Sequence, residues 1–228
     1  MSENAYAPSA DDFRAVVRSV MMSMSLDKLQ GVDGRHYQIF CRDQSVGLVG
    51  ETCLPELKDF NQRIFVDENY KPRHDASGRI VLVLESPHRY EFTSERKGLQ
   101  PKGPAFGKTG SGVRKFLKCK IPVDLGDVDS HELILVNAVQ FQCSLGLPLW
   151  NHPDNQRFKN AVVLKCLRQR AFLDHLRYRV RSLVKDSGDI VAIASGRASG
   201  ANQCVEKSIH GLTCRVLCGL GHPSSWKF

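Results

Sequence analysis

Four short runs of apolar residues punctuate the chain beyond residue 78, and a loop with glycine or proline follows each of them. The runs are Arg79–Leu84, Leu133–Val139, Asp189–Ala194 and Cys214–Leu220. Helical periodicity lies between them, most clearly in Asn155–Leu167 and Ala171–Val184. Valine-, isoleucine- and leucine-rich runs that alternate with helices are typical of a parallel sheet covered on both faces. The pattern therefore predicts an α/β fold, a three-layer α/β/α sandwich with a four-stranded parallel central sheet.

The first 78 residues show a different pattern. A helix is predicted from about Ala10 to Leu26, with Ser9 as its N-cap and an apolar stripe that includes Phe13. Residues 27–78 read as irregular, with one short strand candidate at His36–Cys41. A turn-rich stretch, Lys71–Gly78, then marks a boundary. We expect a helical N-terminal extension, residues 1–78, packed on an α/β domain formed by residues 79–228.

Positive charge is concentrated in one window. The formal net charge is +8, and residues 96–123 contain eight basic side chains and no acidic one, so the rest of the chain sums to zero. A run of this kind is either a solvated basic face or a surface that binds a polyanion, since phosphate neutralisation requires clustered lysine and arginine. Lys108, Arg114 and Lys115 are the candidate contacts to a nucleic-acid backbone.

Composition narrows the class of protein further. The chain is 42% hydrophobic and 25% charged, which is typical of a globular domain. Its apolar runs are far shorter than the roughly 20 residues that cross a bilayer, so no membrane partner is expected. The first residues lack a basic start and an apolar stretch, which favours a cytoplasmic location. Eight scattered cysteines without a CxxC pair indicate reduced thiols, and no metal site is predicted.

Polar residues with chemical potential follow each predicted strand. Glu85–Tyr90 follows the first, Asn137 lies within the second, Ser195–Ala198 follows the third and Gly221–Trp226 follows the fourth. In open parallel sheets, ligands bind at the carboxyl ends of the strands. The sequence therefore predicts one site that these four segments share.

Taken in this order, the segments resemble the uracil-DNA glycosylase superfamily over about residues 79–226. Leu84–His88 is similar to the superfamily's first motif, where a water-handling loop follows the first strand. Asn137 lies in a strand like the one whose asparagine reads the pyrimidine edge, and His222–Ser224 is similar to the His-Pro-Ser of the second motif. Gly103–Gly107 lies where relatives carry an aromatic residue that stacks on the flipped base, here Phe106.

The resemblance implies a monofunctional DNA glycosylase. Such an enzyme flips a pyrimidine out of DNA, hydrolyses its N-glycosidic bond and leaves an abasic site, in DNA repair or in antiphage defence. A monomer acting on double- or single-stranded DNA without a cofactor is expected. The resemblance gives three sets of site residues: Glu85, Ser86 and His222 for catalysis; Asn137, Phe106 and His88 for the base; and Pro87, Lys108, Arg114, Lys115, Pro223, Ser224 and Trp226 for DNA.

The chemistry of the side chains agrees with these roles. Negative charge develops on the departing base, so a donor such as His222 aimed at a ring carbonyl lowers the barrier. Positive charge develops on the sugar, where the Glu85 carboxylate would help. Asn137 can both donate to and accept from a base edge. Trp226 is expected to fill the gap that the flipped nucleotide leaves, with packing on the domain as the alternative.

Two positions depart from the founding branch of the superfamily. Ser86 replaces an aspartate that activates water, and a serine hydroxyl can hold a water molecule without acting as a carboxylate base. His88 replaces a tyrosine that blocks groups at C5 of the pyrimidine, which would admit a 5-substituted base. The close cysteine pair of the iron–sulfur branch is absent, so no cluster is expected.

Other functions fit less well. Gly103–Thr109 is one residue short of a phosphate-binding P-loop, and no strand immediately precedes it. Cys214, Cys218 and His222 lie along a predicted strand, where four-residue steps of roughly 13 Å are too long for shared metal ligation. The main alternative is a non-catalytic nucleic-acid-binding protein on the same fold. The excised base also stays open between uracil and a hypermodified cytosine.

Overall fold

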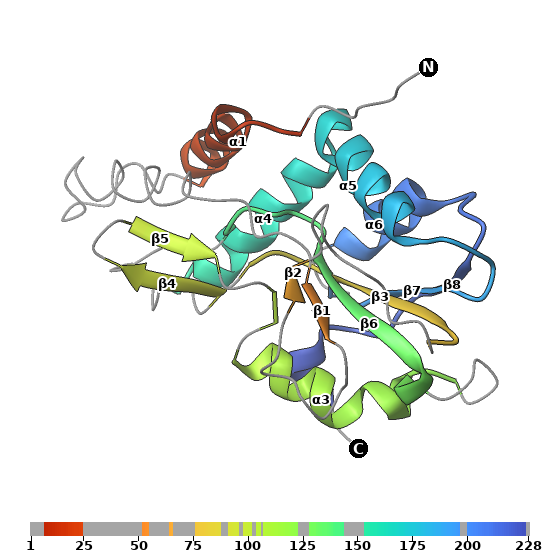
Figure 1. The fold of residues 1–228 in the computed structure, drawn as a ribbon. Coiled ribbons are helices and arrows are strands. Elements are labelled where there is room, and N and C mark those ends of the chain that lie inside the picture. Colours follow the sequence, from red (N-terminus) through yellow and green to blue (C-terminus); the bar gives the residue numbers. More distant parts are fainter. Residues whose placement is uncertain are drawn as a thin grey trace.

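A six-stranded sheet in the order β2-β1-β6-β3-β7-β8 forms the centre of the computed structural model (Figure 1). Its four consecutive strands β6, β3, β7 and β8 are all parallel, as the apolar runs predict. These strands span Gly78–Leu84 (β3), His131–Asn137 (β6), Ile190–Ile193 (β7) and Arg215–Leu217 (β8). The structure describes residues 7–24, 52–54, 64–65, 76–87, 91–95, 98–101, 104–105, 107–122, 128–143, 153–196 and 200–226.

Helices cover both faces of the sheet, which confirms the three-layer α/β/α sandwich (Figure 1). One face carries α1, α4, α5 and α6, and the other carries α3 and the short 3-10 helix η7. The helices span Ala10–Ser23 (α1), Lys108–Lys120 (α3), Asn155–Leu167 (α4), Arg170–Leu183 (α5) and Ala201–Ile209 (α6), and the 3-10 helices span Val128–Ser130 (η5) and Pro223–Ser225 (η7).

The N-terminal part contributes more than helix. Strand β1, Thr52–Leu54, pairs antiparallel with β6, and β2, Ile64–Phe65, pairs with β1 at the edge of the sheet. The strand candidate at residues 36–41 lies outside the described residues. A separate antiparallel hairpin, β4 (Phe92–Glu95) and β5 (Gly98–Pro101), follows β3 in the chain. Neither β1 nor this hairpin was expected from the hydrophobic pattern.

Helix α1 forms where the sequence predicts it and packs on the core. Ser9 caps its first turn, because the Ser9 side chain accepts from the backbone of Asp12 while the Asp12 side chain accepts from the backbone of Ser9. The predicted apolar stripe is buried, and Phe13 stacks on Phe141, with ring centroids 4.6 Å apart. This burial attaches the extension to the same apolar cluster that covers the sheet.

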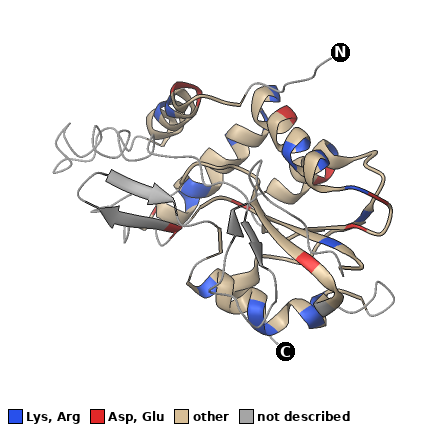
Figure 2. Cartoon of the chain, in the orientation of Figure 1, with Lys and Arg blue, Asp and Glu red and all other residues tan. Residues whose placement is uncertain are grey.

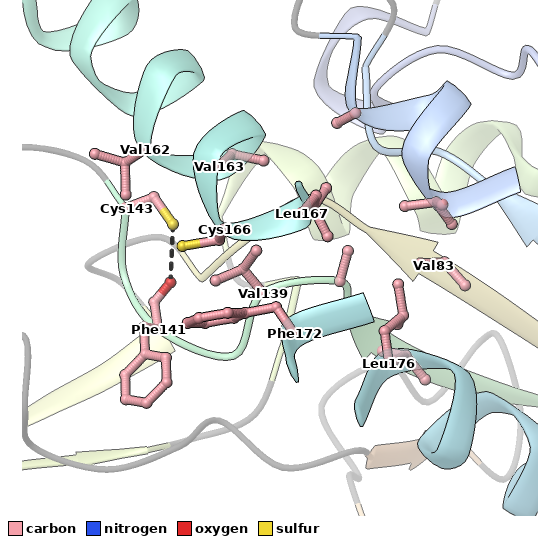
Figure 3. Packing of buried hydrophobic residues seen from close by; sticks show 14 of the residues in the cluster. Val83, Val139, Phe141, Cys143, Val162, Val163, Cys166, Leu167, Phe172 and Leu176 are labelled. Atoms are coloured by element: carbon pink, nitrogen blue, oxygen red, sulfur yellow. Dashed lines mark hydrogen bonds between the residues drawn. The ribbon is translucent and has the colours of Figure 1, made fainter. Parts of the chain in front are cut away.

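Alternation along the strands separates two apolar clusters. In β3, Val81 and Val83 belong to the cluster under α1, α4, α5 and α6, whereas Ile80, Leu82 and Leu84 belong to the cluster under α3. Figure 3 shows part of the first cluster, in which α4 and α5 side chains close over the sheet. The central strands β3, β6 and β7 are therefore buried on both faces, and their carboxyl ends are the part left for chemistry. No helix in the described part of the chain is long and apolar enough to span a membrane.

Candidate active site

The parallel register brings the predicted motifs to one edge of the sheet. Leu84 pairs with Asn137, so Glu85 begins at the level where β6 ends. Val83 pairs with Ile193, which places Ser195 and Gly196 beside the same edge. The chain then returns through β8 to His222. These segments are far apart in the sequence, and the sheet topology alone places them together.

Glu85 is a buried carboxylate that an ion pair stabilises. It is only 4% exposed, and its Oε1 lies 2.7 Å from Nζ of Lys159 on α4. Burying an isolated carboxylate is costly, and a paired ammonium offsets that cost. Nothing in the sequence singles out Lys159, because a lysine in a helix is usually a surface residue. Its partner lies on a strand end that only the tertiary fold brings near.

Gly196 separates Glu85 from His222. A Cβ atom at this position would lie 3.2 Å from Oε2 of Glu85 and 4.0 Å from Cβ of His222. Gly196 also has a φ of +88°, which L side chains rarely adopt. Both facts explain why the segment that follows β7 carries a glycine at this position. The distances place the Glu85 carboxylate and the Cβ of His222 beside the same glycine.

His222 is oriented by its own turn. The backbone N–H of Ser224 donates to Nδ1 of His222 at 3.3 Å, and the Ser224 hydroxyl lies 2.8 Å from the same nitrogen. A nitrogen that accepts a backbone N–H carries no proton, so neutral His222 bears its proton on Nε2. Burial lowers the pKa of His222 below its ordinary value of 6.5, the Lys159 ammonium lowers it further, and Glu85 opposes both. Near neutral pH the imidazole is therefore uncharged and presents an Nε2–H donor.

Asn137 is fixed at the end of β6 by two charged groups. Its Nδ2 donates to Oε2 of Glu91 at 3.1 Å. Its backbone carbonyl accepts from both terminal nitrogens of Arg179, at 3.1 and 3.0 Å. Oδ1 of Asn137 is buried and has no hydrogen-bond partner among the described residues, and the same holds for Oγ of the neighbouring motif residue Ser86. Buried polar atoms left in this state are typical of a site that binds a ligand or water.

Helix α3 carries the described part of the basic window. Lys108, Arg114, Lys115 and Lys118 are exposed along it and are called the α3 basic face below. Figure 2 shows these positive charges along the helix. The sequence pattern does not predict this helix, because Gly110 and Gly112 lower its helix propensity.

The glycine at position 112 has a packing reason. A Cβ atom there would lie 1.9 Å from the carbonyl oxygen of Pro223, so only glycine lets α3 lie against the His-Pro-Ser turn. The α3 basic face and the turn that contains His222 are therefore parts of one packed unit.

One of the predicted DNA contacts, Trp226, occupies a different position from the one expected. Trp226 retains only 5% exposure, packs in the α3-side cluster and donates from Nε1 to the carbonyl oxygen of Leu220 at 2.7 Å. A side chain in this position does not project into a duplex, so the wedge interpretation is corrected to the packing one. Pro87 and Pro223 are buried too, and their contribution is to shape the turns, whereas Ser224 is exposed.

Two of the predicted base contacts, His88 and Phe106, lie outside the described residues. Their roles stay predictions. Within the described ranges, no group of three His, Cys, Asp or Glu side chains gathers as metal ligands would.

Two further residues of the site could have been noticed from the sequence. Arg179 falls on the apolar face of α5 together with Phe172, Leu176 and Leu183, and a charge on such a stripe signals a buried partner. Glu91 stands between Tyr90 and Phe92, and an acid flanked by aromatics is a weak sign of burial.

Comparison of the chain with protein-family models, curated proteins and solved structures found no match.

Proposed function

We propose that this chain is a monofunctional DNA glycosylase that hydrolyses the N-glycosidic bond of a pyrimidine nucleotide flipped out of DNA. The observation that carries the proposal is that the Glu85 carboxylate and His222 both lie beside Gly196 at the carboxyl edge of the sheet. A buried carboxylate and a neutral imidazole with its proton on Nε2 are the two groups that this reaction needs at opposite ends of the breaking bond. The motif order described above supports the same assignment.

The geometry supports a definite division of roles. When the bond between C1′ and the base breaks, its electron pair leaves with the base, and the Nε2–H of His222 stabilises the charge that develops on a ring carbonyl. The carboxylate of Glu85 stabilises the positive charge on the sugar. A water molecule, for which the hydroxyl of Ser86 offers a hydrogen bond, adds to C1′ and gives one proton to Glu85. Glu85 then releases that proton to solvent, and the departed base takes up one proton from solvent. Lys159 keeps the carboxylate in place and stabilises its charge.

The α3 basic face supports DNA as the substrate. Its exposed side chains lie on the helix that packs against the His222 turn, so a phosphate backbone bound there passes close to the site. Affinity from this surface would be independent of sequence, as backbone contacts are.

Lys159 also bears on the type of glycosylase. A Schiff-base mechanism needs an amine that is free to attack C1′, whereas Nζ of Lys159 is held by Oε1 of Glu85 at 2.7 Å. We therefore expect hydrolysis without strand cleavage. Borohydride added during turnover should not trap a covalent complex with DNA, and a trapped complex lost in Lys159→Arg would show a lyase instead.

A second candidate function is nucleic-acid binding without catalysis. The replacement of a carboxylate by Ser86 favours it, because the hydroxyl cannot act as the base. This alternative predicts the same salt-sensitive binding but no abasic sites. The two candidates therefore differ in one measurement.

The deciding experiment measures abasic sites under single-turnover conditions. Oligonucleotides carrying uracil, 5-hydroxymethylcytosine or a glucosylated cytosine are incubated with the protein and then cleaved by mild alkali. We expect at least one substrate to be processed, and His222→Ala and Glu85→Gln each to slow base release by about 10²-fold or more. His210→Ala, a change at an exposed histidine outside the site, is the matched control and should keep the full rate. Full rates in both site variants would reject the assigned residues, and no product from any substrate would favour the binding protein.

A further inference from the structure

Glu91 is a buried acid that the proposed reaction does not use. It retains 2% exposure and stands directly before β4. Its Oε2 accepts from Nδ2 of Asn137 at 3.1 Å, and its Oε1 accepts from the backbone N–H of Ala105 at 2.9 Å. Both oxygens accept hydrogen bonds from N–H donors, which is the pattern of an ionised carboxylate. It joins the end of β6 to the segment that leads into α3.

An ionised carboxylate fixes which way an amide points. It can accept but never donate, so the NH₂ of Asn137 must face Glu91 and the carbonyl oxygen must face away. The reverse orientation would bring two acceptors together and leave two donors unpaired. The guanidinium of Arg179 holds the backbone of Asn137 from the other side, which prevents the strand end from adjusting. The position of Oδ1 is therefore set by a neighbour rather than by the ligand.

The fixed oxygen has no hydrogen-bond partner in the part of the chain that the structure describes. Oδ1 of Asn137 is buried, and an unmet buried acceptor is destabilising. A ligand that brings a hydrogen-bond donor to this point removes that cost, and a ligand that brings an acceptor adds repulsion. Uracil and cytosine differ in this respect. Uracil carries a donor at N3 and an acceptor at position 4, whereas cytosine carries an acceptor at N3 and a donor at position 4.

We infer that Glu91 is the positioning residue that sets base specificity, by locking the Asn137 amide in one orientation so that the site accepts only one of the two pyrimidine edge patterns. The inference rests on the proposed function in one respect, namely that Asn137 contacts the flipped base. A site built around a fixed buried acceptor rejects the mismatched pattern strongly, because the mismatch leaves polar groups unpaired. An amide free to rotate by half a turn would read both patterns.

The decisive variant is Glu91→Gln. Its single side-chain oxygen can keep the bond from the Ala105 N–H, so its NH₂ faces Asn137 and the Asn137 amide must turn round to present its oxygen to it. The double variant Glu91→Gln with Asn137→Asp restores an acceptor toward the ligand, because the introduced amide then donates to one oxygen of the introduced carboxylate. The other carboxylate oxygen takes the place of Oδ1. This exchange of donor and acceptor is a rescue that a merely structural role of Glu91 does not predict.

The test compares equilibrium binding of two oligonucleotides that differ only in one unpaired nucleotide, deoxyuridine or deoxycytidine. The wild type should distinguish them by tenfold or more, Glu91→Gln should reverse the preference, and the double variant should show the wild-type preference by tenfold or more again. Equal binding by the wild type, or an unchanged ratio in a folded Glu91→Gln protein, would overturn the inference. Abasic sites measured in the same samples report separately on the proposed reaction, so a failure of catalysis is distinguishable from a failure of the lock. Melting temperatures establish that each variant is folded.

Discussion

Removing the Trp226 side chain tests whether the last turn of the described chain belongs to the core or to the DNA interface. The indole retains 5% exposure and lies in the apolar cluster beneath α3, together with Val113 and Leu117. Its Nε1 donates to the carbonyl oxygens of Leu220 at 2.7 Å and Gly221 at 3.2 Å. These contacts anchor the residues on either side of His222. The change Trp226→Ala should therefore weaken the fold and the site together.

The size of the effect follows from the burial. Truncation of a buried tryptophan to alanine costs about 3–5 kcal/mol. In a chain of this length, each kcal/mol lowers the melting temperature by about 2–4 °C, so we expect a fall of about 6–20 °C. Trp226→Phe keeps most of the apolar contact but removes the indole donor. Its cost should be about 1–2 kcal/mol, or about 2–8 °C.

Thermal unfolding followed by circular dichroism measures these shifts, and rates on single- and double-stranded substrates are measured beside them. Tyr178→Ala is the matched control, since Tyr178 is an aromatic residue on α5 that is 44% exposed. It should cost under about 1 kcal/mol. For Trp226→Ala we expect both rates to fall together with the melting temperature. An unchanged melting temperature with a selective loss of duplex activity would refute the packing assignment and restore the wedge.

Three further changes give separable results. Gly112→Ala places a Cβ 1.9 Å from the Pro223 carbonyl oxygen, so the turn that contains His222 must move by roughly 1 Å or more, and the rate should fall by about 10²-fold. Cys119→Ala, at an exposed position on the same helix, should leave the rate unchanged. Three charges of the α3 basic face are reversed by Lys108→Glu, Arg114→Glu and Lys115→Glu. This change should weaken binding to all DNA sequences and reduce the slope of log K against log salt concentration by about 2–3. Unchanged binding at low salt would mean that the face is only solvated. Because the pKa of His222 in the folded protein lies below 6.5, the unfolded chain binds the proton first, so the free energy of unfolding decreases as the pH falls from 6.5 towards the folded-state pKa. Urea unfolding between pH 5 and 8 should show this decrease in the wild type and not in His222→Gln. The same pH dependence in both proteins would contradict the prediction.

The hydrophobic pattern predicted the central layers well because burial on both faces imposes long apolar runs. Strand β3 and helix α4 were predicted within one residue, Asn155–Leu167 at the same bounds. The pattern overestimated β8, where the apolar run continues into a loop that ends at the Trp226 anchor. Helix α3 escaped notice for the opposite reason. Its glycines lower helix propensity locally, and the benefit appears only when Pro223 packs against Gly112.

The candidate site divides in the same way. Glu85, Asn137 and His222 could be placed from the sequence because parallel strands deliver their following residues to one edge. Lys159 could not, and Glu91 could be recognised only as an acid with a weak sign of burial, since the roles of both depend on single contacts between segments far apart in the chain. Trp226 was placed wrongly as a DNA contact, because position relative to a motif says nothing about which way a side chain points. The spacing of a motif gives a residue's position along the backbone, whereas the burial of its side chain depends on how the core of this protein packs.

Helix α3 links affinity to chemistry, and the two properties are separable along its surface. Its exposed face carries the lysines and arginine that would meet phosphate, while the side at Gly112 seats the turn that orients His222. Charge reversal on the exposed face changes the long-range attraction to DNA and leaves the contact between Gly112 and Pro223 unchanged. The equilibrium constant for DNA binding should therefore change, while the rate at saturating DNA does not. A methyl group at Gly112 does the reverse, because it displaces the turn without altering a charge. A binding protein without catalysis would respond to the first change alone, which makes this single helix a test of both proposed functions.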